Sequence, residues 1–253
     1  DLVTGLIGMR LAALAGLAAL LACLPALARR CGADPAEALW LGALNPLVLL
    51  HVVAGAHNEA LMLGLLGAGL TVAFRHRFAL ATVLITLAAL IKAPAVLGLA
   101  VVASLWHKTL RVGVIALTTT VVVTELTGVG YGWIGAVHTS AAPHAWSLTT
   151  AIGRLFGTQM AMVFWVSMGL AATVAICVIV WLRRRRLGEV YALGLGLAAI
   201  GMLGPATRPW YALWGLVPLA ASAPRGRVRH WAAAVSTGLT FILLPNGFGV
   251  VTL

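Results

Sequence analysis

Apolar runs separated by short breaks recur along the whole chain. Runs broken by charge or by proline and glycine clusters predict helices near residues 2–28, 38–55, 60–74, 78–91, 95–106, 110–127, 160–182, 187–205, 209–223 and 231–245. At roughly twenty residues for each bilayer span, 253 residues hold about ten spans with short loops. The pattern therefore predicts an all-α fold, a polytopic transmembrane helical bundle with about nine to ten spans.

Composition supports a membrane class. Hydrophobic residues make up 62% of the chain and charged residues 9%, whereas in soluble domains about a quarter of residues are charged and under half are apolar. The loops leave no room for a soluble domain, so residues 1–253 are expected to form one membrane-embedded domain. Because the sequence opens on Asp1, inside an apolar run, we expect that the N-terminal part of the protein is missing from it.

Basic residues predict the orientation. Thirteen of the 17 Lys and Arg residues fall in alternate loops, at Arg29/Arg30, Arg75/Arg77, Lys108/Arg111, Arg183 to Arg186 and Arg225/Arg227/Arg229. The positive-inside rule places these loops in the cytoplasm of a multi-pass plasma-membrane protein, and places residues 55–60, 92–94, 128–159 and 206–209 on the extracytoplasmic face. The basic loops are interpreted as topology signals that attract membrane lipids. No nucleic-acid partner is expected, since the net charge of +11 does not lie on one soluble face.

Two segments depart from the pattern. The runs 78–91 and 95–106 are too short to cross a bilayer and meet at "LIKAPAVLG", where Pro94 disfavours helix at Ala93. Lys92 is thus expected below the outer surface. Residues 128–159 have no long apolar run, and we expect an extracytoplasmic loop with a short interfacial helix, with Trp133 and Trp146 at headgroup depth.

Polar residues interrupt the apolar pattern at "HVVAGAHNEALMLGLL", residues 51–66. A carboxylate within the bilayer is normally paired or faces a wet cavity, but Asn58 and Glu59 also suit a helix N-terminus, as cap and as dipole partner. His51 and His57 suit either hydrogen-bonded structural groups or site residues. Their spacing to Glu59 matches no zinc signature.

No metal or other cofactor is predicted, although the need for a divalent cation stays open. Cys23, Cys31 and Cys177 have no metal-ligand spacing and are interpreted as small packing residues.

Three cations lie on the side opposite to the basic loops: Lys92, Arg154 and Arg208. Such residues either snorkel at a span end or bind an anion such as a phosphate. Arg208 is followed by Trp210 and Tyr211, which suit an ordinary aromatic belt or a wall on which a sugar ring stacks.

Four segments carry a resemblance to a known family: residues 38–70, with the Asn-Pro and Ala-His-Asn-Glu block; 88–99, "AALIKAPAVLGL"; 128–153; and 208–220, "RPWYALWGLVPLA". In the same order, over about residues 5 to 245, they resemble the polyprenol-phosphate-mannose-dependent α-1,6-mannosyltransferases, which are integral-membrane glycosyltransferases of the GT-C type. The family block usually ends in His-Asn-Asp, and here Glu59 is one methylene longer.

The resemblance implies a hexosyltransferase with a GT-C-like fold. It would transfer mannose, with inversion, from a polyprenyl-phosphate-mannose donor to an α-1,6-mannan acceptor of the lipomannan type, in lipoglycan biosynthesis at the outer face. Lys92 and Arg208 would bind the phosphate, and His57, Asn58, Trp210 and Tyr211 would bind substrate. The catalytic base would be an acid in the missing N-terminal part or, as the alternative, Glu59. A flippase for a lipid-linked sugar, or a secondary transporter of an anionic substrate, remains the rival interpretation.

Overall fold

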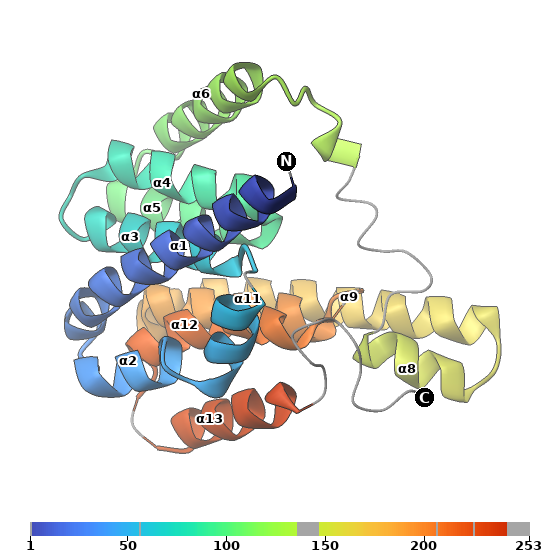
Figure 1. The fold of residues 1–253 in the computed structure, drawn as a ribbon. Helices are drawn as coiled ribbons and strands as arrows, with labels where there is room; N and C mark the ends of the chain where they lie inside the picture. The colour runs from blue at the N-terminus through green and yellow to red at the C-terminus, as the bar shows by residue number, and fades with distance from the viewer. Residues whose placement is uncertain (1, 56, 136–146, 206, 225, 242–253) are drawn as a thin grey trace.

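The computed structural model describes residues 2–55, 57–135, 147–205, 207–224 and 226–241, and the regular elements within these ranges are all helical (Figure 1). The long helices are α1 (Leu2–Arg30), α3 (Glu59–Ala73), α4 (Phe78–Ile91), α5 (Leu97–Trp106), α6 (Thr109–Thr127), α9 (Gln159–Leu182), α11 (Glu189–Leu203), α12 (Ala212–Ser222) and α13 (Arg227–Thr240). The short elements are α2 (Pro35–Gly42), η1 (Val48–Ala54), η2 (Ala93–Val96), α8 (Leu148–Leu155), α10 (Arg184–Leu187) and η3 (Pro209–Tyr211).

The predicted all-α polytopic membrane fold is confirmed, but among the described residues only three or four of the predicted nine to ten spans are long and apolar enough to cross a bilayer. Three helices are long and apolar enough to cross a bilayer on their own, namely Val3–Arg30, Thr109–Thr127 and Gln159–Leu182. A fourth span results if η1 and α3, which meet at a bend of 107°, are counted as one. Other apolar helices, such as α4 and α11, are shorter. Broken and short helices of this kind are tolerated at membrane depth where neighbouring protein satisfies the backbone.

The predicted span 38–55 is wrong, because the chain is interrupted within it. Helix α2 ends at Gly42, and the π-helix η1 starts at Val48. The Asn45 side chain joins the two ends: its Nδ2 donates to the carbonyl of Leu41 (2.7 Å), and its Oδ1 accepts from the backbone N–H of Val48 (3.1 Å). Such a bridge satisfies backbone groups that a break would otherwise leave unpaired inside the protein.

The helices pack in two groups (Figure 1). In the first, α3 lies between α1 and α4, and α5 and α6 pack on α4. In the second, α11 lies between α9 and α12, while α8 packs on α9, and α2 and α13 pack on α12. Contacts of α1 with α2 and with α12 join the groups, and residues of both, such as Leu24, Leu66 and Trp214, share one buried core.

The close crossing of α1 and α3 depends on two glycines. A Cβ at Gly16 in α1 would overlap the backbone of Ala60 and Leu61, and a Cβ at Gly64 in α3 would overlap the carbonyl of Gly16. Small residues allow such close backbone approach, which is how helices gain packing energy in lipid.

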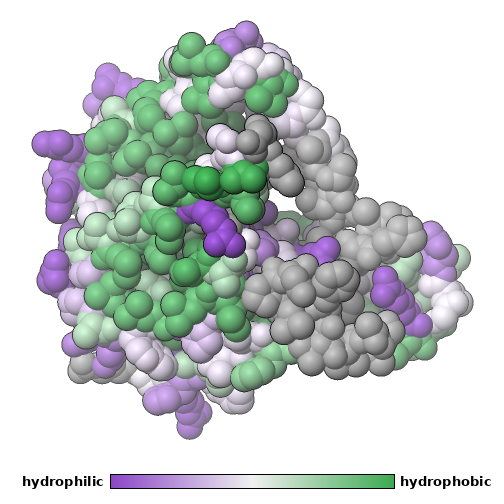
Figure 2. Space-filling model, in the orientation of Figure 1, coloured by the Kyte–Doolittle hydropathy of each residue, from purple (hydrophilic) through white to green (hydrophobic). Residues whose placement is uncertain are grey.

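The five basic loops lie at one end of the bundle. Arg30 lies 5.1 Å from the Phe74 ring centroid, one residue before Arg75. The Arg184 guanidinium donates to Ser104 (3.3 Å), close in sequence to Lys108. Figure 2 shows a row of hydrophilic residues along the left edge of a largely apolar surface.

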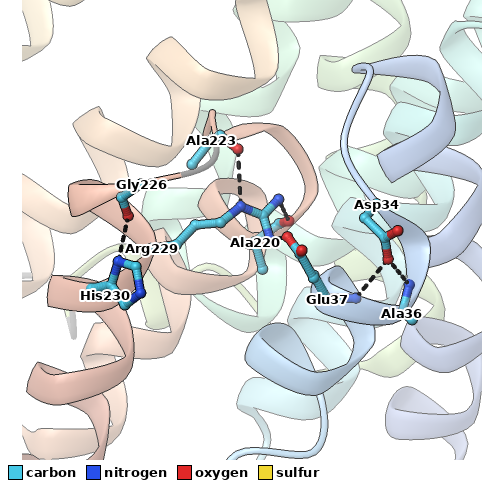
Figure 3. Close-up of polar contacts among 8 residues, drawn as sticks. All are labelled: Asp34, Ala36, Glu37, Ala220, Ala223, Gly226, Arg229 and His230. Atoms are coloured by element: carbon cyan, nitrogen blue, oxygen red, sulfur yellow. Dashed lines mark hydrogen bonds and ion pairs between the residues drawn. The ribbon is translucent and has the colours of Figure 1, made fainter.

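Arg229 joins the remaining basic loop to the same end (Figure 3). Its guanidinium pairs with Glu37 in α2 (3.2 Å) and donates to the carbonyls of Ala220 (3.0 Å) and Ala223 (3.1 Å) at the end of α12. A cavity of about 640 Å³ is lined by residues that include Gly32, Leu187 and Arg229. The basic loops are therefore neighbours in space, as the alternation of charge predicted.

Candidate functional site

The end of the bundle opposite to the basic loops contains a cluster of polar and aromatic side chains. It is built from three breaks between helices: the η1–α3 break, the α4–η2 break and the loop before η3. These correspond to three of the predicted extracytoplasmic loops, 55–60, 92–94 and 206–209.

Lys92 lies where α4 ends. Its backbone is extended (φ −145°, ψ 115°), its N–H closes the last turn of α4 on Ala88 (3.0 Å), and its carbonyl accepts from Ala95 in η2 (3.0 Å). The sequence placed the break at Ala93, whereas Ala93 already belongs to η2. The Lys92 side chain is partly buried, with an exposed fraction of 25%.

Glu59 is the ionic partner of Lys92. Its Oε1 lies 3.0 Å from the Lys92 Nζ, and its side chain is fully buried. No well-directed hydrogen bond reaches either carboxylate oxygen from the described residues, so the pairing is mainly Coulombic. Glu59 is also the first residue of α3, where the helix dipole favours negative charge. The buried carboxylate is thus paired, one of the two arrangements that the sequence left open.

Aromatic rings complete the surroundings of the ammonium group. The Lys92 Nζ lies 5.3 Å from the Tyr211 ring centroid, within the range of a cation–π contact. Tyr211 stacks on Trp214 at 4.1 Å and meets Trp210 edge to face at 6.2 Å. Trp210 is half-buried and Trp214 is buried, so Lys92 lies against a packed aromatic wall as well as against Glu59.

His57 and His51 lie on the other side of Trp210. The Trp210 ring centroid lies 4.2 Å from that of His57 and 5.1 Å from that of His51. The His57 Nδ1–H donates to the carbonyl of His51 (2.9 Å), which leaves Nε2 of His57 free to accept a hydrogen bond. The reversal of the chain needs Gly55, because a Cβ there would lie 2.6 Å from the His51 carbonyl and 2.7 Å from His57 Nδ1.

His51 is fully buried within the π-helix η1. Neither of its ring nitrogens has a hydrogen-bond partner among the described residues. π-helical turns occur frequently at functional sites, and sequence reasoning treated His51 only as an undecided imidazole. Gly55, His51 and Trp214 belong to the cluster although they were not among the predicted site residues. The polar motif of residues 51–66 did contain His51, but its role was left open, and no local pattern indicates Gly55.

Three expected residues are not part of these contacts. Asn58 is exposed and its side chain does not cap α3, so the capping interpretation is wrong. Arg208 is extended and exposed, and its guanidinium makes no hydrogen bond or ion pair with the described residues. Arg154 lies at the exposed end of α8. Arg208 nevertheless immediately precedes Pro209 and the aromatic wall.

The predicted loop 128–159 does contain a short helix, α8, which Ser147 and Thr150 start with a reciprocal capping box. Trp133 is 37% exposed, and Trp146 lies outside the described residues. No group of three or more His, Cys, Asp and Glu in the described ranges forms a metal site, and the absence of a cofactor stays a prediction.

Two family models match consecutive parts of the chain. The N-terminal domain of the α-(1→6)-mannopyranosyltransferases matches residues 1–108, and a C-terminal domain of the same group matches residues 138–252. The chain belongs to the α-(1→6)-mannopyranosyltransferase family. The mannosyltransferase resemblance drawn from the sequence is confirmed.

Individual relatives agree. The chain is 32% identical to α-(1→6)-mannopyranosyltransferase B of Corynebacterium glutamicum, over 99% of this chain and 49% of that protein. It is 31% identical to α-(1→6)-mannopyranosyltransferase A of Mycobacterium tuberculosis (98% and 54%) and 31% identical to a probable α-(1→6)-mannopyranosyltransferase of Mycolicibacterium smegmatis (90% and 50%). The chain thus spans about half the length of the curated relatives it matches. No solved structure matches it significantly.

Proposed function

We propose that the protein transfers mannose from a polyprenyl-phosphate-mannose donor to an α-1,6-mannan acceptor of the lipomannan type, with inversion, on the extracytoplasmic face of the plasma membrane. The observation that carries the proposal is the Lys92 ammonium, which lies 3.0 Å from Glu59 and 5.3 Å from the Tyr211 ring at the end opposite to the basic loops. Membership of the family supports the reaction class.

A phosphate leaving group needs positive charge as the glycosidic C–O bond breaks. Lys92 has such a charge in a partly buried place, where electrostatic stabilisation is stronger than in water. Because α4 ends at Lys92, the ammonium group is already in position before a ligand binds. The exposed guanidinium of Arg208 is free to bind a second phosphate oxygen, because it has no ion-pair partner among the described residues.

The aromatic wall suits the sugar of the donor. Trp210 and Tyr211 present flat, partly exposed faces beside Lys92, and the free Nε2 of His57 is a hydrogen-bond acceptor for a sugar hydroxyl. The sugar and the phosphate of the donor would then bind next to each other, which is necessary because they are covalently joined.

Glu59 acts in this proposal as the counter-ion of Lys92. Its fully buried side chain and its short contact with the ammonium favour the positioning of a cation over acceptance of a proton from an acceptor hydroxyl, which needs direct hydrogen-bond reach. We therefore assign the base to a group other than the described residues of the cluster. No metal is part of the proposal.

Membrane vesicles that contain the full-length protein test the reaction. They receive a synthetic polyprenyl phosphomannose with labelled mannose and a short α-1,6-mannoside. An enzyme lengthens the labelled mannoside, whereas a flippase or transporter moves the donor or its sugar and leaves the mannoside unchanged. Transport without elongation would overturn the proposal.

The face of the membrane needs a separate test. Single cysteines at Asn58 and at His76, which lie at opposite ends of α3, are labelled in intact cells with an impermeant maleimide. We expect label at position 58 from outside and at position 76 only after permeabilisation. The reverse pattern would contradict the extracytoplasmic assignment.

A further inference from the structure

An apolar crevice of about 260 Å³ lies between α5, α9 and α11, away from the candidate site. Its walls include Leu97, Ala100, Cys177, Val178, Trp181 and Gly196. Helix α11 packs on both α5 and α9 and forms the floor. Small residues on α5 and α11 leave the space open, because Ala100 and Gly196 stand where larger side chains would fill it. A crevice of this composition suits a hydrocarbon chain.

The crevice continues into a polar cavity at the basic end of the bundle. Ala100 and Trp181 line both spaces, so the two adjoin, and together they are called the groove. The second cavity is about 680 Å³, and its other walls include Ser104, Glu189 and the two cations Arg184 and Arg185. The groove therefore has an apolar body and a cationic end.

The cationic end is organised by the protein itself. The Arg184 Nη1 donates to the carbonyl of Trp181 (2.9 Å), its Nε donates to Ser104 Oγ (3.3 Å), and its guanidinium lies 4.5 Å from the Trp181 ring centroid. Ser104 in turn donates to Glu189 (2.7 Å). These contacts fix the orientation of Arg184 without using its Nη2.

Unlike the guanidinium of Arg184, that of Arg185 is not held in place by contacts with the described residues. Arg185 lines the same cavity, it is exposed, and its guanidinium has no hydrogen-bond or ion-pair partner among the described residues. Guanidinium groups bind phosphate oxygens through paired N–H donors. An anion at this end would thus find one fixed and one free guanidinium.

We propose that this groove binds one anionic phospholipid, with an acyl chain in the crevice and the phosphate at Arg185 and the free edge of Arg184. A soluble phosphate would leave the apolar body unused, and a neutral lipid would offer no anion to the guanidinium of Arg185. Basic pockets between helices on the positive side of a membrane bind anionic lipid headgroups in the same way. The lipid would join α5, in the part matched by the N-terminal family model, to α9 and α11, in the part matched by the C-terminal one.

Trp181 supplies a local readout, because it lines both parts of the groove. The full-length protein in detergent is titrated with phosphatidylglycerol brominated in its acyl chain, and the quenching that disappears in Trp181→Phe is assigned to the groove. We expect saturable quenching by this lipid at about fivefold or more lower concentration than by brominated phosphatidylcholine, which is the preference expected from roughly 1 kcal/mol for each basic residue near an anionic lipid.

Three variants separate the groove from the general surface. Arg185→Gln should weaken phosphatidylglycerol binding about fivefold, whereas Arg186→Gln, which removes the same charge from the same basic run but does not line the cavity, should leave it unchanged. Ala100→Phe should remove the Trp181 signal by filling the crevice. If that variant does not fold, the matched arginine pair decides the outcome.

Equal quenching by the two lipids would show non-specific boundary lipid only and would overturn the proposal. Equal effects of Arg185→Gln and Arg186→Gln would do the same. If free glycerol phosphate displaced the lipid at the same concentration at which the lipid itself binds, the headgroup alone would account for binding. That result would contradict the role given to the crevice.

Discussion

Glu59 at the start of α3 and Lys92 at the end of α4 form an ion pair, with 3.0 Å between Oε1 and Nζ, at the open end of the α3–α4 hairpin. The carboxylate is fully buried and the ammonium is partly exposed. This asymmetry gives the two charges different roles, since only the ammonium can meet a ligand without a rearrangement of the helices.

Removal of the Lys92 charge should lower donor turnover. We expect Lys92→Ala in the full-length protein to reduce kcat/KM for the polyprenyl phosphomannose by at least about tenfold, because the leaving phosphate loses a stabilising charge. Since Glu59 would then be buried without its cation, the double variant Lys92→Ala/Glu59→Gln checks that the loss persists when no charge is left unpaired. Recovery of turnover in the double variant would contradict a phosphate role for Lys92.

Arg208→Ala should also lower turnover by at least about tenfold but should leave stability unchanged, because its exposed side chain makes no ion pair with the described residues. Turnover of labelled donor and thermal unfolding of the same preparation measure both effects. Arg154→Ala, which removes an exposed cation from α8, is the matched control. If Arg208→Ala and Arg154→Ala lowered turnover equally, the loss would reflect the removal of any exposed positive charge, and this would contradict a specific role for Arg208.

Glu59→Gln distinguishes a counter-ion from a base. If Glu59 only positions Lys92, the variant should keep measurable turnover and an unchanged acidic limb in its pH–rate profile. Loss of a general base would lower the rate by roughly 10²- to 10⁴-fold and would remove that limb. The pH dependence of kcat/KM, measured at saturating acceptor, separates the two outcomes.

The α1–α3 crossing should not tolerate a side chain at Gly64. Gly64→Val would push a branched side chain against the carbonyl of Gly16, and overpacking of this kind costs about 1 to 3 kcal/mol. The matched control is Gly8→Val in α1, where a Cβ would meet nothing within 4 Å. Thermal unfolding in detergent should show a lower Tm for the first variant only, and equal Tm values would contradict the crossing.

Cys31 should alkylate slowly near neutral pH. Burial raises the pKa of its thiol from 9.0 to about 11, with a smaller opposing effect of Arg30. Because the thiolate is the reactive form, a pKa raised by two units lowers its fraction at pH 8 about a hundredfold. Labelling should therefore speed up with each pH unit towards pH 11. The rate relative to Cys31 in unfolded protein, followed by mass spectrometry, measures this, and equal rates at pH 8 would contradict the shift.

The helices were predictable because their signal is local. The apolar runs correspond to described helices within a few residues, from α1 at the beginning to α12 near the end, since the cost of exposing backbone polar groups to lipid forces apolar runs into helices. The error at 38–55 has a local cause. Asn45 and Pro46 interrupt the apolar run, and the Asn45 side chain bridges Leu41 and Val48 across the break.

The candidate site was predictable in part. Unusual residues, such as Lys92 and Glu59 in apolar surroundings, identified its members one by one. Their relationships came from contacts between breaks far apart in sequence. The sequence left the role of His51 open and gave no sign of Gly55, because only the packing of His51 against Trp210 and the close approach of Gly55 to His57 make them part of the cluster.

The sequence alone determined the membrane class, the helical runs, the grouping of basic loops and the family, because hydropathy, charge alternation and motif order are properties of the chain itself. The tertiary structure decided that Glu59 is the partner of Lys92, that Asn58 does not cap α3, and that Arg184 and Arg185 end an apolar groove. The absence of the cap follows from the helical backbone of Asn58 itself, whereas the ion pair and the groove depend on which helices meet, and helices approach closely where small residues lie between them.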